Sequence, residues 1–398
     1  MAPRALDTLP RADAAAPAPE QLRDLYRTLA NVRQLDVSAV AWQRQGLIPG
    51  YAPMLGQEAA QVGAGAGVDK TKDFVFPTYR EMGVAYTLGV NMVEYMSTHK
   101  AIWHGGLYDP VATHFAPFQA VVGGSVLHAV GWAHGQTLNA QSVNAQPLNG
   151  PALNDQPLNG ATLNDQTLNE SAAHPAGEAG DANAAAASAS KTGLGVALAF
   201  LGDGASSQGD VHEAMNFAAI LKAPVVFFVQ NNGWAISVPT EQQVAGGSVA
   251  ARAAGYGMPA VQVDGNDVLA VLEATQRAVA HARAGLGPVV VEAMTYRRGP
   301  HSTSDDPGRY RTLDDEKIDG GEDPLSRFRR VLLAQGAADE AFFAEADAEA
   351  QARADEIRDG IVALESRPGR EMFDFVFQES TPTLGVQARQ WREESEHV

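Results

Sequence analysis

Two short polar segments carry the residue types in this sequence that are best suited to chemistry. Gly202-Asp203-Gly204 offers a carboxylate between two glycines, and Asn231-Asn232 offers two carboxamides after residues 205–230. Carboxylate, amide and backbone carbonyl oxygens are the ligands that a hard cation such as Mg²⁺ prefers. Glycine lets the backbone approach an anion closely because it has no side chain. The two segments together predict a site for a divalent cation and an organic diphosphate.

The residues around these segments predict the elements that bring them together. The unbroken apolar run 196–201 predicts a strand covered on both faces, residues 211–221 predict a helix, and the run 225–229 predicts a second strand. Because a right-handed crossover makes the two strands parallel, Asp203 and Asn232 should emerge at the same carboxyl edge of the sheet. The N-terminus of the helix between them would turn free N–H groups toward an anion.

Further patterns extend this unit into a doubly wound α/β fold. Val261-Gln262-Val263 and the run beginning at Val289 predict two more strands, and Asp267 is expected to cap a helix that reaches about Ala284. Beyond Pro324 the chain is alanine-rich and acidic, with apolar residues at helical spacing. We therefore expect a mostly parallel sheet with helices on both faces, followed by a helical C-terminal region.

Composition divides the chain into four parts. We expect a disordered leader over residues 1–20, a single discontinuous α/β domain over 21–135 and 192–325, and the helical region over 326–398. The remaining part, 136–191, interrupts the α/β domain between a predicted helix and a predicted strand. Such a connection lies at the amino edge of the sheet, where an insertion leaves the opposite edge open.

The insertion begins with a five-residue repeat over residues 136–170. Its copies run Gln-Thr-Leu-Asn-Ala, Gln-Ser-Val-Asn-Ala and Gln-Pro-Leu-Asn-Gly, with four more up to Glu170. A solenoid that stacks a leucine column is one interpretation. Each copy has only one apolar residue and prolines recur, so burial offsets little of the entropy lost on ordering. We therefore expect residues 136–191 to be disordered.

Composition also excludes several classes of function. The chain has 398 residues, 45% of them hydrophobic, which is enough for a large core. Its formal charge of −18 argues against nucleic acids and anionic membranes as partners, since both attract basic surfaces. The absence of cysteine excludes disulfides, thiolate metal sites and a cysteine nucleophile. With no long apolar run and no apolar leader, we expect a cytoplasmic protein.

The Gly-Asp-Gly and Asn-Asn segments at this spacing resemble the signature of thiamine diphosphate enzymes. Either segment alone is common in ordinary turns. From about Leu22 to Leu325 the chain resembles the α subunit of the decarboxylating component of 2-oxo acid dehydrogenase complexes. The loop 299–306 is more similar to the branched-chain branch than to the pyruvate branch. The other similar segments are Gln57-Glu58-Ala59, Tyr79-Arg80-Glu81, Val263-Asp264-Gly265-Asn266-Asp267 and Glu292-Ala293-Met294-Thr295-Tyr296-Arg297.

The resemblance implies thiamine diphosphate and Mg²⁺ as cofactors and assigns roles to individual residues. Asp203, Asn232 and the carbonyl of Trp234 would hold the metal ion. His301, in a loop after a strand, would be a proton carrier that titrates near neutral pH. The implied cofactor-binding residues are Tyr79, Arg80, Ala120, Val122, Gly202, Asp203, Gly204, Ala205, Asn232, Trp234 and His301.

The chain also departs from the family in places. Gln230 stands where branched-chain relatives often have an arginine that contacts phosphate. The segment 116–125 differs from the usual branched-chain pattern, which puts a monovalent-ion site there in doubt. Ser302 and Ser304 match positions that are phosphorylated in mitochondrial relatives, but serines that cap loop backbone are the favoured interpretation.

In this family the glutamate that activates the cofactor belongs to a separate β subunit, and this chain has no second pyrimidine-binding domain. The resemblance therefore implies an α2β2 heterotetramer that works with a lipoyl acyltransferase core on branched-chain 2-oxo acids. A subunit specific for pyruvate or acetoin is the first alternative. A non-catalytic nucleotide-binding or regulatory module is the second, although Gly63–Lys70 fails both the Walker and the dinucleotide spacings.

Overall fold

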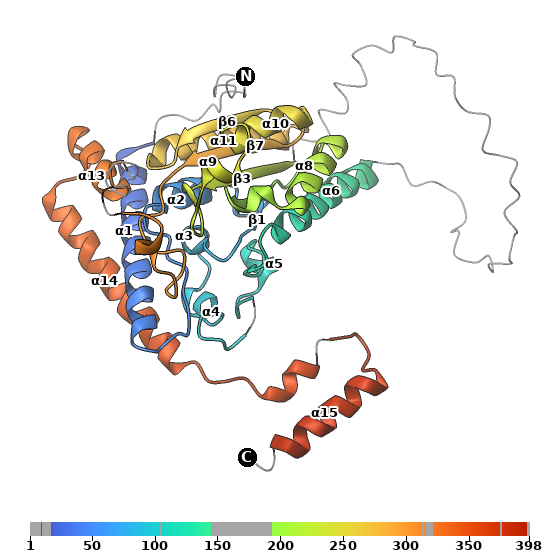
Figure 1. Ribbon diagram of the computed structural model, residues 1–398. Coiled ribbons are helices and arrows are strands. Elements are labelled where there is room, and N and C mark those ends of the chain that lie inside the picture. Colours follow the sequence, from blue (N-terminus) through green and yellow to red (C-terminus); the bar gives the residue numbers. More distant parts are fainter. Residues whose placement is uncertain are drawn as a thin grey trace, which may run out of the picture.

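The computed structural model describes residues 9, 17–103, 105–144, 193–312, 314, 321–374 and 376–395 (Figure 1). A sheet of five parallel strands forms its centre, in the order β1-β2-β3-β7-β6. The strands are β1 (Phe74–Phe76), β2 (Ala197–Gly202), β3 (Val225–Asn231), β6 (Ala260–Asp264) and β7 (Val289–Met294). The predicted parallel α/β fold is therefore confirmed.

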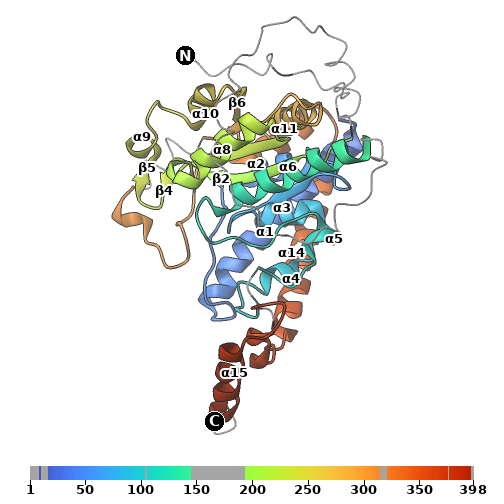
Figure 2. The same ribbon diagram turned by 90° about the vertical axis from the view of Figure 1, so that its right-hand side faces the viewer.

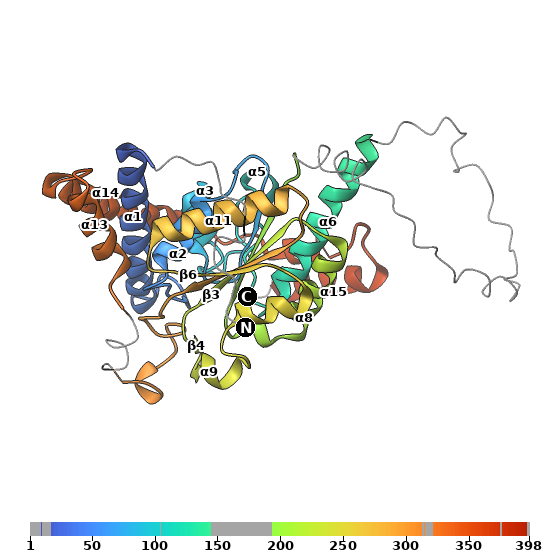
Figure 3. The ribbon, with the colours of Figure 1, turned by 90° about the horizontal axis from the view of Figure 1, so that it is seen from above.

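Helices cover both faces of the sheet, as the unbroken apolar strands require (Figures 2 and 3). In β2, Leu198 and Phe200 face the first layer, whereas Ala197, Ala199 and Leu201 face the second. The first layer contains α1 (Pro19–Arg44), α2 (Glu58–Ala66), α3 (Met82–Leu88) and α11 (Val268–Arg283). The second contains α6 (Gly124–Asn144), α8 (Gly209–Leu221) and α10 (Val249–Ala253).

The glycine-rich run 63–70 begins in a helix and ends in the connection that follows it. Its first residues lie within α2, where Gly63 packs against α11. A Cβ atom at Gly63 would lie 2.7 Å from the carbonyl oxygen of Val268, and one at Gly67 would lie 2.7 Å from Cβ of Thr275. The glycines therefore allow two helices to pack closely, which agrees with the failure of this run to match the nucleotide-loop spacings.

Two expected boundaries also need correction. Helix α6 continues to Asn144, past the expected start of the insertion at residue 136, because the first repeat copies lack proline and can extend an existing helix. Helix α1 begins at Pro19, since proline is well tolerated in the first helical turn. Leu9 is buried, and its carbonyl accepts a hydrogen bond from Arg277 at 2.6 Å. The rest of the expected leader up to residue 16 and the tract 145–191 lie outside the described residues.

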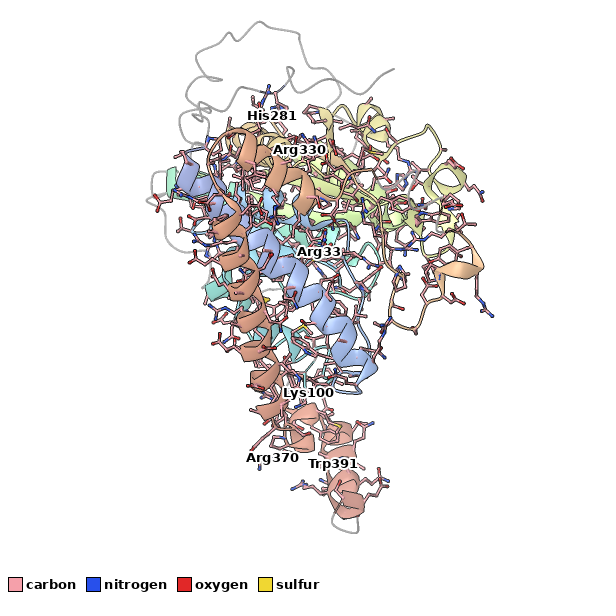
Figure 4. The ribbon with its side chains drawn as sticks, turned by 90° about the vertical axis from the view of Figure 1, so that its left-hand side faces the viewer. Arg33, Lys100, His281, Arg330, Arg370 and Trp391 are labelled. Atoms are coloured by element: carbon pink, nitrogen blue, oxygen red, sulfur yellow. The ribbon has the colours of Figure 1, made fainter. Side chains whose placement is uncertain are left out.

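The C-terminal region is helical, as predicted. Helix α14 (Glu340–Ala363) runs beside α1 (Figure 4), where the ring of Phe343 lies 4.8 Å from that of Tyr26. Helix α13 (Pro324–Ala334) packs on α1 as well, whereas α15 (Pro382–Ser395) stands away from the main body (Figure 1). The shorter elements are α4 (Met92–Met96), α5 (Pro110–Thr113), β4 (Trp234–Ala235), β5 (Val238–Pro239) and α9 (Thr240–Gln243). Among the helices that the structure describes, none is long and apolar enough to span a membrane.

Candidate active site

A cavity of about 240 Å³ opens at the carboxyl edge of the sheet, beside the ends of β2 and β3. It gathers the polar residues that the sequence places after these strands, together with side chains from distant segments. Its lining residues are Gln57, Thr78, Tyr79, Arg80, Glu81, Val122, Gly123, Gly202, Asp203, Gly204, Ala205, Gln230, Asn232, Trp234, Ala235, Ile236 and His301. Every residue expected to bind cofactor or metal is among them except Ala120, which borders a separate hollow beside Trp103.

Asp203 follows β2 directly and is almost fully buried. Its Oδ2 accepts hydrogen bonds from the hydroxyl of Thr240 at 2.5 Å and from Nε2 of Gln243 at 3.2 Å. Burial raises the pKa of Asp203, and the hydrogen bond from Thr240 acts in the opposite direction. A bound cation would compensate the cost of burying this charge.

Asn232 follows β3, and the crossover through α8 places it beside Asp203, as the topology predicted. Its backbone N–H donates to Oδ1 of Asp203 at 3.4 Å, and its side-chain Nδ2 donates to Oε1 of Gln57 at 3.2 Å. Its Oδ1 accepts from the backbone N–H of Trp234 at 3.2 Å. A hydrogen bond therefore connects the two turns that carry the expected metal ligands Asp203 and Asn232.

The donor set fits a hard divalent cation. Asp203 offers a carboxylate, Asn232 an amide oxygen and Trp234 a backbone carbonyl, which are all oxygen ligands of the kind that Mg²⁺ prefers. The carbonyl of Trp234 also accepts from Nη1 of Arg297 at 3.4 Å. Within the described residues, no three or more His, Cys, Asp or Glu side chains gather as an alternative metal site.

Arg80 is the main positive charge in the lining of the cavity. It is 6% exposed, and it donates from Nη1 to the carbonyl of Pro53 and from Nη2 to the carbonyl of His301 at 2.9 Å. Its guanidinium carbon also lies 5.4 Å from the centre of the Tyr79 ring. A guanidinium fixed in this way presents a fork suited to phosphate oxygens.

His301 lines the same cavity, with its Nδ1 3.2 Å from Nη2 of Arg80. Burial, followed by the charges of Arg80 and Arg297, lowers the pKa of His301 to about 4. The expectation that this side chain titrates near neutral pH is therefore wrong for the protein without an anion. The imidazole is therefore neutral at pH 7.

The loop that carries His301 is held by a chain of hydrogen bonds. Nη2 of the buried Arg297 donates to the Tyr310 hydroxyl at 2.7 Å, and this hydroxyl donates to Oδ2 of Asp305 at 2.5 Å. The same carboxylate oxygen accepts the backbone N–H of His301 at 2.8 Å. These contacts fix the histidine backbone at the edge of the cavity.

Ser302 and Ser304 lie in this loop. Their hydroxyls are 3.0 Å apart and hydrogen-bond to each other, which differs from the expected capping of loop backbone.

The backbone after β2 approaches the cavity as the glycines predict. A Cβ atom at Gly204 would lie 2.7 Å from Cβ of Ala235, so only glycine fits beside the β4 residue. A 3₁₀ turn (Ala205–Ser207) separates Gly204 from α8, which begins at Gly209. The residues that line the cavity here thus belong to the tight turn that precedes α8.

Sequence reasoning assigned no role to a set of buried polar residues on the cavity floor. Glu81 accepts from the hydroxyl of Thr78 and from Nε2 of Gln230, both at 2.6 Å, and burial raises its pKa. Oε1 of Gln230 accepts from Nε2 of Gln61 at 3.0 Å. Gln230 therefore links Glu81 and Gln61 by hydrogen bonds at the position where relatives often have an arginine. The family-like segments at residues 57–59 and 79–81 were the sequence signal for Gln57 and Glu81.

Comparisons with known proteins agree with this geometry. The family described as "Dehydrogenase E1 component" matches residues 26–361. The chain is 40% identical to the 3-methyl-2-oxobutanoate dehydrogenase subunit alpha of Mycobacterium tuberculosis over 376 residues, which cover 94% of this chain and 88% of that protein. It is 34% identical to the pyruvate dehydrogenase E1 component subunit alpha of Staphylococcus aureus over 318 residues, which cover 80% of this chain and 71% of that protein.

Proposed function

Because the chain belongs to the dehydrogenase E1 component family, as an α-type subunit of the 2-oxo acid dehydrogenases, we propose that it acts on branched-chain 2-oxo acids. The relative with the higher identity, over more of the chain, is named for 3-methyl-2-oxobutanoate, and the relative at 34% is named for pyruvate. The loop 299–306 favours the same choice. The reaction is the oxidative decarboxylation of the 2-oxo acid with acyl transfer to a lipoyl group.

The observation that carries the cofactor-dependent chemistry of this proposal is the convergence of Asp203, Asn232, the Trp234 carbonyl and Arg80 on one cavity. The E1 family depends on thiamine diphosphate, which when bound supplies the electron sink for decarboxylation. In the proposal, the three oxygen ligands hold Mg²⁺, and Arg80 offsets the phosphate charge. His301 is neutral before the anion arrives, and the negative charge of the diphosphate would raise its pKa and favour its protonated form.

An α2β2 assembly fits the surface beside the cavity. Val121, Val122, Ile236 and Val238 are 41–65% exposed there, and two of them line the cavity. Apolar side chains around a site mark a surface for a partner. In the proposal, the β subunit covers this rim and contributes the missing glutamate, and the assembled component serves a lipoyl acyltransferase core.

The test is reconstitution with the β subunit of the same component. We expect kcat/KM for 3-methyl-2-oxobutanoate to exceed that for pyruvate by at least about tenfold, which one or two methyl groups in an apolar pocket can supply. A preference for pyruvate would favour the alternative substrate. Decarboxylation by the purified single chain would argue against a site completed by two subunits.

Calorimetry separates catalysis from the nucleotide-binding alternative. The reconstituted pair should bind thiamine diphosphate in the presence of Mg²⁺ and show no heat with ATP or NAD. Binding of ATP alone would reverse this assignment.

A further inference from the structure

A buried carboxylate on α1 does not line the cavity, but hydrogen bonds connect it to residues that do. Asp36 lies in the middle of α1 and is 1% exposed. Its Oδ1 accepts two hydrogen bonds, from the hydroxyl of Tyr51 at 2.7 Å and from the backbone N–H of Met54 at 2.9 Å. Both donors belong to residues 50–57, which we call the strap. One carboxylate oxygen of Asp36 therefore holds the strap at two of its residues, Tyr51 and Met54.

The strap in turn holds Arg80. The carbonyl of Pro53 accepts from Nη1 of Arg80, and Pro53 directly precedes Met54, whose N–H is bound by Asp36. Nη2 of the same guanidinium is bound by His301. The two ends of the guanidinium are thus fixed by separate segments, and the strap decides where one of them lies.

The strap also holds the loop of His301. The backbone of Tyr51 forms a pair of hydrogen bonds with Thr303, which donates its N–H at 2.8 Å and accepts at its hydroxyl at 3.1 Å. The carbonyl of Leu55 accepts from the N–H of Arg298 at 3.0 Å. His301 lies between these two attachment points. Movement of the strap would therefore shift both Arg80 and His301, the two groups proposed to face the anion.

A carboxylate is a costly way to hold this position. Removing a charge from water costs free energy, and a buried polar group can often be replaced by an apolar one without loss of stability. The carboxylate accepts two hydrogen bonds, and their directional geometry fixes the positions of both donors. Such contacts determine geometry more than stability.

From these contacts we propose that Asp36 is a positioning residue for the anion-binding end of the site. Through Tyr51 and Met54 it fixes the strap, and the strap fixes Arg80 and the His301 loop. The inference rests on the proposed cofactor function, because the ligand of that end is the diphosphate of thiamine diphosphate.

The test measures the Kd of thiamine diphosphate at saturating Mg²⁺ by calorimetry, in the assembly with the β subunit. Asp36→Leu removes the acceptor, and Tyr51→Phe removes one donor and keeps the ring. We expect each to raise Kd by about tenfold, the effect of one weakened charge-assisted hydrogen bond at Arg80. Asp36→Asn keeps an oxygen at Oδ1 and should leave Kd within about twofold, since both donors are still satisfied.

Two controls separate positioning from general stability. Tyr108→Phe also removes a buried tyrosine hydroxyl, one that donates to the carbonyl of Ala116 at 2.9 Å. It should lower Tm and leave Kd unchanged. In an Arg80→Met background, Tyr51→Phe should raise Kd by clearly less than tenfold, since the part of its effect that passes through Arg80 is already lost.

The outcomes decide between the alternatives. An unchanged Kd in Tyr51→Phe, with a lowered Tm, would show that Asp36 only stabilises the fold and would overturn the inference. This variant decides the matter even where Asp36→Leu does not fold. If the unsubstituted assembly binds no thiamine diphosphate, both the proposed function and the positioning role of Asp36 fail. If every variant binds it with normal Kd, only the positioning role fails.

Discussion

Arg80 and His301 are 221 positions apart in the chain and are joined by two contacts. Nη2 of Arg80 lies 3.2 Å from Nδ1 of the imidazole and donates to the carbonyl of the same residue at 2.9 Å. Because arginine can only donate, Nδ1 is an acceptor, and the neutral ring carries its proton on Nε2. Protonation at Nδ1 would place two cations in contact. The cavity is thus poised to bind an anion.

The first prediction concerns the titration of His301. The pKa is about 4 in the free protein, mainly because of burial and then because of Arg80 and Arg297. Arg80→Met should raise it, but not to the ordinary value of 6.5, because burial remains. Histidine ring signals followed by NMR across pH, assigned with His301→Gln, measure the change. A titration near pH 6.5 in the unsubstituted protein would contradict the assignment.

The same pKa has a consequence for stability. The unfolded state binds the proton first, so the contribution of neutral His301 is complete above about pH 6.5 and is lost as the pH falls toward about 4. His301→Gln should make unfolding less sensitive to pH within this window. Denaturant unfolding at a series of pH values provides the measurement, and an unchanged slope would speak against a depressed pKa.

Asp203→Asn should separate function from stability. The change removes a buried charge whose pKa is raised by burial, and Asn keeps an oxygen to accept from Thr240 and Gln243. We expect Tm to stay the same or rise. Mg²⁺-dependent binding of thiamine diphosphate should weaken by at least about a hundredfold, because the proposed metal ligand loses its charge. A large fall in Tm would indicate that the carboxylate serves the fold.

Thr240→Val should weaken the proposed metal site without changing any of its expected ligands. The Thr240 hydroxyl donates to Oδ2 of Asp203 and lies 3.2 Å from Oδ1 of Asn231, so it braces both turns that carry the expected ligands. Loss of such an outer contact typically lowers metal affinity by about 10- to 100-fold. Thr240→Ser keeps the hydroxyl and is the matched control. Mn²⁺ titration followed by electron paramagnetic resonance reads the affinity directly, and equal affinities for Val and Ser would refute the bracing role.

Residues 146–191 should be replaceable by a short linker. The strand that follows is anchored independently, since Asp73 accepts the N–H of Val196 and Arg283 donates to the carbonyl of Leu194, both at 2.9 Å. Trp132 of α6 lies against Gly195, and the helix rises about 18 Å from there to Asn144.

Ten Gly/Ser residues, which span up to about 33 Å, would close this gap. Tm and cofactor affinity should stay unchanged in the shortened protein. Loss of folding would mean that the tract packs on the domain.

The amino-acid sequence alone determined the parts of the site that follow from local pattern and strand direction. Two buried apolar runs and an intervening helix dictate a right-handed parallel unit, and this topology brings Asp203 and Asn232 to one edge without further information. The resemblance to the family marked Tyr79, Arg80, Trp234 and His301 as neighbours of the cofactor, and the structure places them around one cavity.

The tertiary structure decided what depends on the packing of distant segments. The contact between Arg80 and His301, the low pKa that follows from it, and the support from Asp36 through the strap join parts of the chain that share no periodic pattern. The same holds for Ala120, which packing directs to another hollow. Local sequence specifies where a strand ends and which face of a helix is apolar. Which buried polar groups then meet is set only when the layers pack and every donor must find an acceptor.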